Sequence, residues 1–121
     1  MDIFKEIFTT DGRLNRLRYI KYMLTLALIA GTATFVTSSM ATFLTGNPTG
    51  TLVNVITGIW ALIAGAGNVM LMIRRLHDLN RIGWVAIWAF VPVIGFIFSI
   101  YLFCAKGTVG WNRYGADPLQ E

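Results

Sequence analysis

The residues best suited to chemistry lie in one octet, Arg74-Arg75-Leu76-His77-Asp78-Leu79-Asn80-Arg81. The octet contains the only histidine of the chain and three of its seven arginines. It is flanked by two long apolar runs, 52–73 and 83–105. A charged segment between two such runs must either lie at a membrane surface or be buried with its charges paired. In both cases we expect it to be the most constrained polar part of the chain.

Helical spacing predicts which octet residues interact. If the helix continues, one face holds the residues at i, i+3, i+4 and i+7, which are Arg74, His77, Asp78 and Arg81. Asp78 is then expected to pair with Arg74 and Arg81. Arg75 and Asn80 would remain free to reach lipid headgroups or a partner, with His77 as a further candidate. The simpler alternative is a self-paired charge cluster that ends a helix.

The sequence contains little of what catalysis or metal binding requires. A metal site needs clustered histidines, cysteines or carboxylates, whereas His77 and Cys104 lie far apart. Nucleophilic catalysis needs a nucleophile with an oriented base, and adjacent helical side chains such as His77 and Asp78 diverge. We therefore predict no catalytic residue, no metal and no cofactor. An acid–base pair of His77 and Asp78 in the membrane remains the enzymatic alternative.

The composition is that of a membrane protein. The chain has 121 residues, of which 55% are hydrophobic and 13% charged, and its mean hydropathy is +0.62. Soluble domains carry about 25% charged residues. Three apolar runs, each near the ~20 residues that a spanning helix needs, predict an all-α, multi-pass transmembrane helix bundle. Residues 1–121 should form one membrane domain, with no room for a soluble catalytic domain.

The expected segments follow from hydropathy and turn residues. They are an interfacial helix over 1–10, membrane segments over 19–44, 52–73 and 83–105, and a tail over 106–121. Ile3, Phe4, Ile7 and Phe8 would form the apolar face of the interfacial helix, and a frayed terminus is the alternative. The tail is rich in turn residues and is expected to cap the bundle.

Pro92 and Gly95 interrupt the third apolar run, which leaves two topologies open. A run of about 23 residues, at about 1.5 Å each, matches a hydrocarbon core of about 30 Å, which favours one kinked span. The alternative is a membrane-inserted hairpin that turns at residues 91–95. The choice decides on which side of the membrane the tail lies.

The basic residues flank the apolar runs instead of forming a nucleic-acid-binding stripe, although the net charge is +4. The positive-inside rule places the N-terminus in the cytoplasm and the uncharged turn at 45–51 outside. The candidate headgroup contacts before the first span are Arg13, Arg16, Arg18 and Lys21. A purely topogenic role for these charges is the simpler interpretation.

Three motifs resemble those of a known family. They are Gly12-Arg13-Leu14-Asn15-Arg16, then Arg74-Arg75-Leu76-His77-Asp78 with Gly83-Trp84, and a tail with Gly107-Thr108, Gly110, Asn112-Arg113-Tyr114-Gly115 and Asp117-Pro118. Together they are similar to the signatures of the YhaH/YhaI family of small bacterial inner-membrane proteins, which share a domain of unknown function. Val85 departs from the pattern, because members often carry an aromatic residue there. The resemblance implies a helical fold, a bacterial cytoplasmic membrane, and an octet that acts together with the tail.

The leading hypothesis is a non-enzymatic membrane module that binds anionic lipid headgroups or a partner protein. Its candidate binding residues are Arg74, Arg75, His77, Asp78, Asn80, Arg81, Asn112, Arg113 and Tyr114. A homo-oligomer or a partner membrane protein is also expected, and nucleic acid is not. The first alternative is a small transporter or channel subunit, with Asn54, Asn68 and the hydroxyls of the first span lining a path. The second is a membrane enzyme that acts on lipid through His77.

Overall fold

The computed structural model describes residues 3–118, and its side chains from Lys5 onward. Its elements are α1 (Ile3–Ile7), α2 (Arg16–Thr45), α3 (Thr51–Asp78), the 3₁₀ helix η1 (Gly83–Phe90) and α4 (Ile94–Cys104). Within the described range only an isolated bridge, Asn112 to Gly115, departs from helices, turns and loops. The predicted all-α class is therefore confirmed. The first two residues of the predicted interfacial helix, the side chains of its Ile3 and Phe4, and tail positions 119–121 lie outside what is described.

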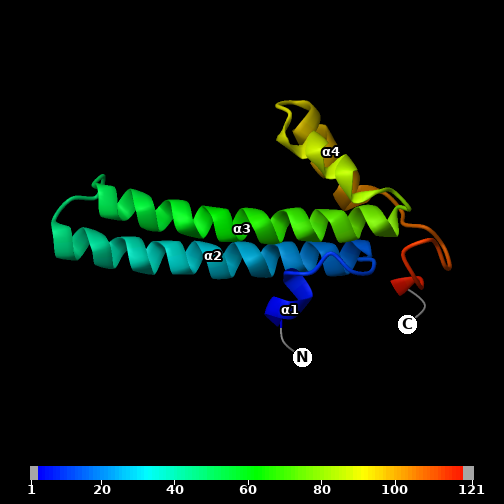
Figure 1. Cartoon of the computed structure of the whole chain (residues 1–121), viewed down its shortest axis with the longest axis horizontal. Coiled ribbons are helices and arrows are strands. Elements are labelled where there is room, and N and C mark those ends of the chain that lie inside the picture. The colour runs from blue at the N-terminus through cyan, green and yellow to red at the C-terminus, as the bar shows by residue number, and fades with distance from the viewer. Residues whose placement is uncertain (1–2, 119–121) are drawn as a thin grey trace.

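Helices α2 and α3 form a long antiparallel pair (Figure 1). The Asn15 side chain caps the start of α2 by accepting from the Arg18 N–H at 2.8 Å. Gly46, at φ +68°, ends α2 and donates its N–H to the Thr42 carbonyl. Both helices are long and apolar enough to cross a membrane. They include the predicted segments 19–44 and 52–73, and α3 continues through the octet to Asp78.

The hydroxyl groups of α2 are used mainly within the helix pair. Thr34 donates to the Ala30 carbonyl at 2.7 Å, and Thr42 bonds to its preceding turn in the same way. Between the helices, the Trp60 indole donates to the Thr37 hydroxyl at 3.0 Å. These bonds satisfy polar groups that would otherwise be costly in hydrocarbon.

The third apolar run folds back on itself, so the single kinked span favoured by its length is wrong. Helix α4 has 11 residues, about 16 Å, which is too short for a hydrocarbon core of about 30 Å. The chain reverses after Pro92, where Val93 adopts a positive φ of 68°. The close turn leaves no room at Gly95, whose added Cβ would overlap the Ala89 carbonyl oxygen. The hairpin returns the tail to the end of α3 (Figure 1).

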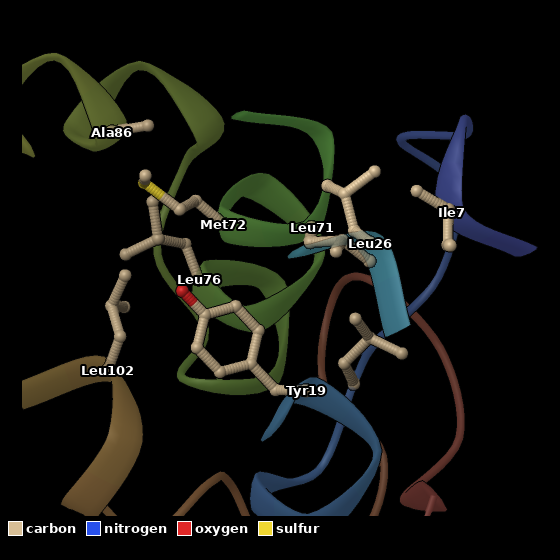
Figure 2. Packing of buried hydrophobic residues seen from close by; sticks show 9 residues of the cluster. Ile7, Tyr19, Leu26, Leu71, Met72, Leu76, Ala86 and Leu102 are labelled. Atoms are coloured by element: carbon tan, nitrogen blue, oxygen red, sulfur yellow. The ribbon is translucent and has the colours of Figure 1, made fainter. Parts of the chain in front are cut away.

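The buried core lies at this same end of the helix pair. Figure 2 shows side chains of all five elements converging around the last turns of α3. The buried hydrophobic cluster consists of Ile7, Leu14, Tyr19, Leu26, Leu71, Met72, Leu76, Ala86 and Leu102. Along the remainder of the pair, large side chains such as Phe35 and Leu62 are exposed, as expected of helices that face lipid. The core thus fixes the loops, the hairpin and the tail around the octet.

Candidate functional site

The site is built on the carboxylate of Asp78, which is 3% exposed. Arg13 Nε donates to Asp78 Oδ1 at 3.1 Å, and Arg75 Nη1 donates to Oδ2 at 2.6 Å. Each carboxylate oxygen therefore has its own guanidinium partner. Buried ion pairs are stabilising only when their remaining polar atoms are also satisfied, and the two arginines meet that condition through backbone carbonyls.

Arg75 is completely buried and joins three segments. Its Nε donates to the Leu102 carbonyl at 2.8 Å, its Nη1 to Leu14 O at 3.2 Å, and its Nη2 to Ala105 O. The expectation that Arg75 is free to reach headgroups is therefore wrong. Helical spacing could not reveal the reason, which is that the returning α4 and the segment before α2 cover this side of α3.

Arg13 is a second buried arginine that joins separate segments of the chain, and it is not a headgroup contact. Its Nη1 donates to the carbonyls of Gly110 at 2.6 Å and Gly115 at 3.1 Å, while its Nη2 reaches Thr108 O. The predicted surface role for Arg13 is corrected accordingly, because its guanidinium is directed into the protein, toward the tail and Asp78. The chain before α2 is thereby bound to the tail.

The tail also caps α3. Thr108 donates its N–H to the Asp78 carbonyl at 2.7 Å, and Asn112 Nδ2 donates to the His77 carbonyl at 2.9 Å. These carbonyls belong to the last turn of α3, which has no further helical turn to donate to it. The His77 carbonyl also accepts from the Asn80 N–H at 3.0 Å. Asp117 in turn accepts from the Gly110 N–H at 2.9 Å. The octet and the tail form one structural unit, as the family resemblance implies.

The other octet residues do not pair as helical spacing predicts. Arg74 does not pair with Asp78, because it donates to the Glu6 carbonyl and lies 3.8 Å from the Glu6 carboxylate. Arg81 lies beyond the end of α3 and donates from Nε to the Tyr101 hydroxyl at 3.0 Å. The chain leaves the helix at this point, so the expected i+3 geometry is lost.

His77, Tyr114, Asn80 and Arg113 form the outer layer of the site. The His77 and Tyr114 rings stack 3.9 Å apart, and His77 Nδ1 lies 3.1 Å from the Gly12 carbonyl. Since a carbonyl only accepts, a hydrogen bond between these two atoms requires the tautomer with the proton on Nδ1. Arg113 Nε lies 3.4 Å from Asn80 Oδ1. The sequence predicts all four as binding candidates, and the structure brings them together.

Comparison with known proteins identifies the family. A family model described as "Protein of unknown function (DUF805)" matches residues 7–116. The chain belongs to the DUF805 family. Inner membrane protein YhaI of Escherichia coli K12 is 54% identical over 48 residues, 40% of this chain and 41% of that protein. Inner membrane protein YhaH of the same strain is 36% identical over 67 residues, 55% of each chain.

The aligned part spans between two fifths and just over half of the length of these curated relatives. No solved structure matches the chain. The predicted membership in a YhaH/YhaI-like family is confirmed, and this DUF805 chain is a multi-pass helical membrane protein with two helices able to span. The family description carries no activity, so function must be argued from the site.

In this DUF805 chain the basic residues at the start of α2 remain on the surface. Arg16, Arg18 and Lys21 are exposed, and Arg16 also donates to the Cys104 carbonyl at 3.2 Å. Among the described residues no group of three histidines, cysteines or carboxylates could hold a metal ion. The exposed guanidinium and ammonium groups can form charge-assisted hydrogen bonds with anionic groups.

Sequence reasoning missed Gly107, which packs directly against the buried carboxylate. An added Cβ on Gly107 would overlap Asp78 Oδ2. The only available signal was the presence of Gly107-Thr108 in the family motif.

Gly107→Ala is expected to lower the free energy of unfolding by about 1–3 kcal/mol, as overpacking does. Thermal unfolding of the purified protein in detergent measures this loss. Gly58→Ala, where an added Cβ meets open space, should not lower the stability. Equal unfolding temperatures of the two variants would contradict the close packing of Gly107 against Asp78.

Proposed function

We propose that the protein is a non-enzymatic membrane module whose charged end binds anionic lipid headgroups at the cytoplasmic surface of the bacterial inner membrane. The observation that carries this proposal is the excess of positive charge among the exposed side chains. Among the described residues seven basic side chains are exposed, whereas Asp11 is the one exposed carboxylate. The exposed basic residues are Lys5, Arg16, Arg18, Lys21, Arg81, Lys106 and Arg113.

The distribution of charge along the chain supports this orientation. Residues 22–73 contain no charged side chain, so the turn at 45–51 is neutral. The opposite end combines the start of α2, the end of α3 and the tail (Figure 1). Basic residues at the ends of spanning helices favour the cytoplasmic side. Anionic lipids of that leaflet attract each nearby lysine or arginine by about 1 kcal/mol.

The buried network supports the proposal indirectly. Arg13 and Arg75 form ion pairs with Asp78 and neutralise its charge. The end of α3 therefore presents no net negative charge. The bonds of Arg13 also hold the tail, which carries Arg113, against the segment before α2. In this account Arg13, Arg75 and Asp78 are scaffold residues, and the surface cations make the contacts.

The two alternatives have less support. The α2 hydroxyls bond largely to their own helix, and Asn54 donates to the Thr49 carbonyl at 3.3 Å. A transporter path would then rest on Asn68, whose buried Oδ1 has no partner among the described residues. The lipid-enzyme alternative pairs His77 with Asp78, but the Asp78 carboxylate is engaged by two arginines.

Neutralising the exposed cations tests the headgroup proposal. The triple variant Arg16→Gln, Lys21→Gln and Arg81→Gln is expected to bind phosphatidylglycerol more weakly, by on the order of 100-fold at low salt if three contributions of about 1 kcal/mol add. Binding is measured by titrating the purified protein in neutral detergent with fluorescent phosphatidylglycerol. The matched control Asp11→Asn removes an exposed charge of opposite sign and should bind as well or better. Undiminished binding by a folded triple variant would refute the proposal.

A further inference from the structure

An apolar groove opens between α3 and η1 next to the charged end. It encloses about 450 Å³, a volume typical of small-ligand sites. Its lining includes Val69, Ile73 and His77 of α3 and Trp84 and Phe90 of η1. Thr10, from the segment before α2, also lines it. Trp84 and Phe90 are 82% and 70% exposed, so the groove is uncovered on the side of η1.

The groove continues along α3 away from the charged end. A second hollow of about 550 Å³ shares Val69, Ile73 and Phe90 with the first and extends to Ala61 and Gly65. Five of the α3 lining residues, from Ala61 to His77, recur at every fourth position, which places them in one row along the helix. From residue 61 to residue 77 this row is about 24 Å long, at about 1.5 Å per residue. The row is therefore longer than the depth of one leaflet of hydrocarbon, which is about 15 Å.

The shape of the groove favours a thin, flexible occupant over a helix. An added Cβ on Gly65 would meet no atom within 4 Å, so a larger side chain at this lining position would project into the hollow. A helix with its side chains is about 10 Å wide. An extended hydrocarbon chain is narrower and apolar, as the lining is apart from Thr10 and His77.

Arg113 provides a positive charge near the His77 end of the groove. His77 lines the groove and stacks on Tyr114, and the Arg113 guanidinium lies 5.4 Å from the centre of the Tyr114 ring. Arg113 is exposed. Arginine presents a fork of N–H donors that suits phosphate oxygens. The guanidinium of Arg113 therefore lies beside Tyr114, whose ring stacks on the groove residue His77.

We propose that the groove binds one acyl chain of an anionic phospholipid, whose phosphate lies at the mouth beside His77 and Arg113. This inference rests on the proposed headgroup function and adds a defined lipid site to it. The exposed basic surface would attract anionic lipid in general, whereas the groove would hold one molecule in a fixed place. Trp84, in the wall of the groove, would contact the bound chain.

Quenching of Trp84 by brominated acyl chains locates the bound lipid. Trp60→Phe, Trp88→Phe and Trp111→Phe leave Trp84 as the only tryptophan, and the unfolding temperature of this background confirms that it folds. The protein is reconstituted in bilayers of mixed phosphatidylglycerol and phosphatidylcholine, with one of the two brominated. At equal mole fractions, brominated phosphatidylglycerol is expected to quench with about fivefold higher apparent affinity, the effect of one cation. Arg113→Gln should abolish that preference.

Gly65→Leu blocks the groove without a backbone clash and separates the two proposals. It should reduce quenching of Trp84 by brominated phosphatidylglycerol by about fivefold or more, while fluorescent phosphatidylglycerol still binds the exposed cations. Gly31→Leu, in open space on α2, is the matched control and should quench as the parent does. Unchanged quenching with Gly65→Leu would overturn the groove and leave the headgroup function standing. Equal quenching by the two lipids, with weak headgroup binding, would overturn both. Loss of quenching upon dimerisation would assign the groove to a second copy and overturn the lipid site.

Discussion

Replacing Asp78 by asparagine is expected to lower the free energy of unfolding by about 3–5 kcal/mol, the cost of breaking a buried ion pair from one side. The asparagine side chain would be uncharged, so the buried guanidiniums of Arg13 and Arg75 would lose their shared counter-ion. Their hydrogen bonds to backbone carbonyls would remain, but two positive charges would then lie close together in a low-dielectric site. Reversible unfolding in mixed micelles, followed by circular dichroism, measures the change.

The exposed carboxylate Asp11 provides the control for this prediction. Asp11→Asn removes the same charge from the same residue type, but on the surface, where substitutions usually change stability by less than about 0.5 kcal/mol. The prediction requires that the free energies of unfolding of the two variants differ by several kcal/mol. If Asp78→Asn unfolds like Asp11→Asn, the carboxylate is not the centre of a buried network.

Arg75→Lys is expected to cost about 3 kcal/mol, because at least two carbonyl oxygens would be buried without donors at about 1–3 kcal/mol each. Arg75 reaches Leu102, Ala105 and Leu14 as well as Asp78. A lysine carries its charge on one nitrogen and cannot match the fork of a guanidinium. The returning hairpin should therefore detach from α3 more readily.

Two measurements check the Arg75 prediction. The unfolding free energy should fall, and trypsin should cleave after Lys106 faster than in the parent protein, because the detached tail becomes accessible. Arg16→Lys, at an exposed position with one carbonyl partner, is the matched control and should change neither quantity by much. Parental stability and cleavage in Arg75→Lys would show that the multiple bonds of the guanidinium are dispensable.

The long helices were predictable from sequence because hydropathy and turn residues determine them locally. Residues 22–73 are uncharged, and Gly46 and Gly50 bound the turn between α2 and α3. The hairpin was harder to predict, because the length of the third run fits one kinked span equally well. What decides it is non-local, since Arg75 binds the carbonyls of Leu102 and Ala105 and so holds the end of the returning run against α3.

The location of the site was predictable, but its internal pairing was not. A charged octet between apolar runs must be paired or solvated, which identified Arg74–Arg81 correctly as a constrained segment. Helical spacing then assigned Asp78 to Arg74 and Arg81, whereas the structure pairs it with Arg75 and Arg13. Arg13 is 65 positions away in sequence, and no periodicity connects residues so far apart.

Membrane topology tests the central claim, that the charged network gathers the segment before α2, the end of α3 and the tail on one cytoplasmic face. Single cysteines are introduced at exposed positions in a Cys104→Ser background, as Asp11→Cys, Thr49→Cys or Val109→Cys. Spheroplasts are then treated with a membrane-impermeant maleimide. The account predicts labelling at position 49 in intact spheroplasts, and at 11 and 109 only after lysis. Labelling at 109 in intact spheroplasts, with 11 still protected, would place the tail outside and contradict the account.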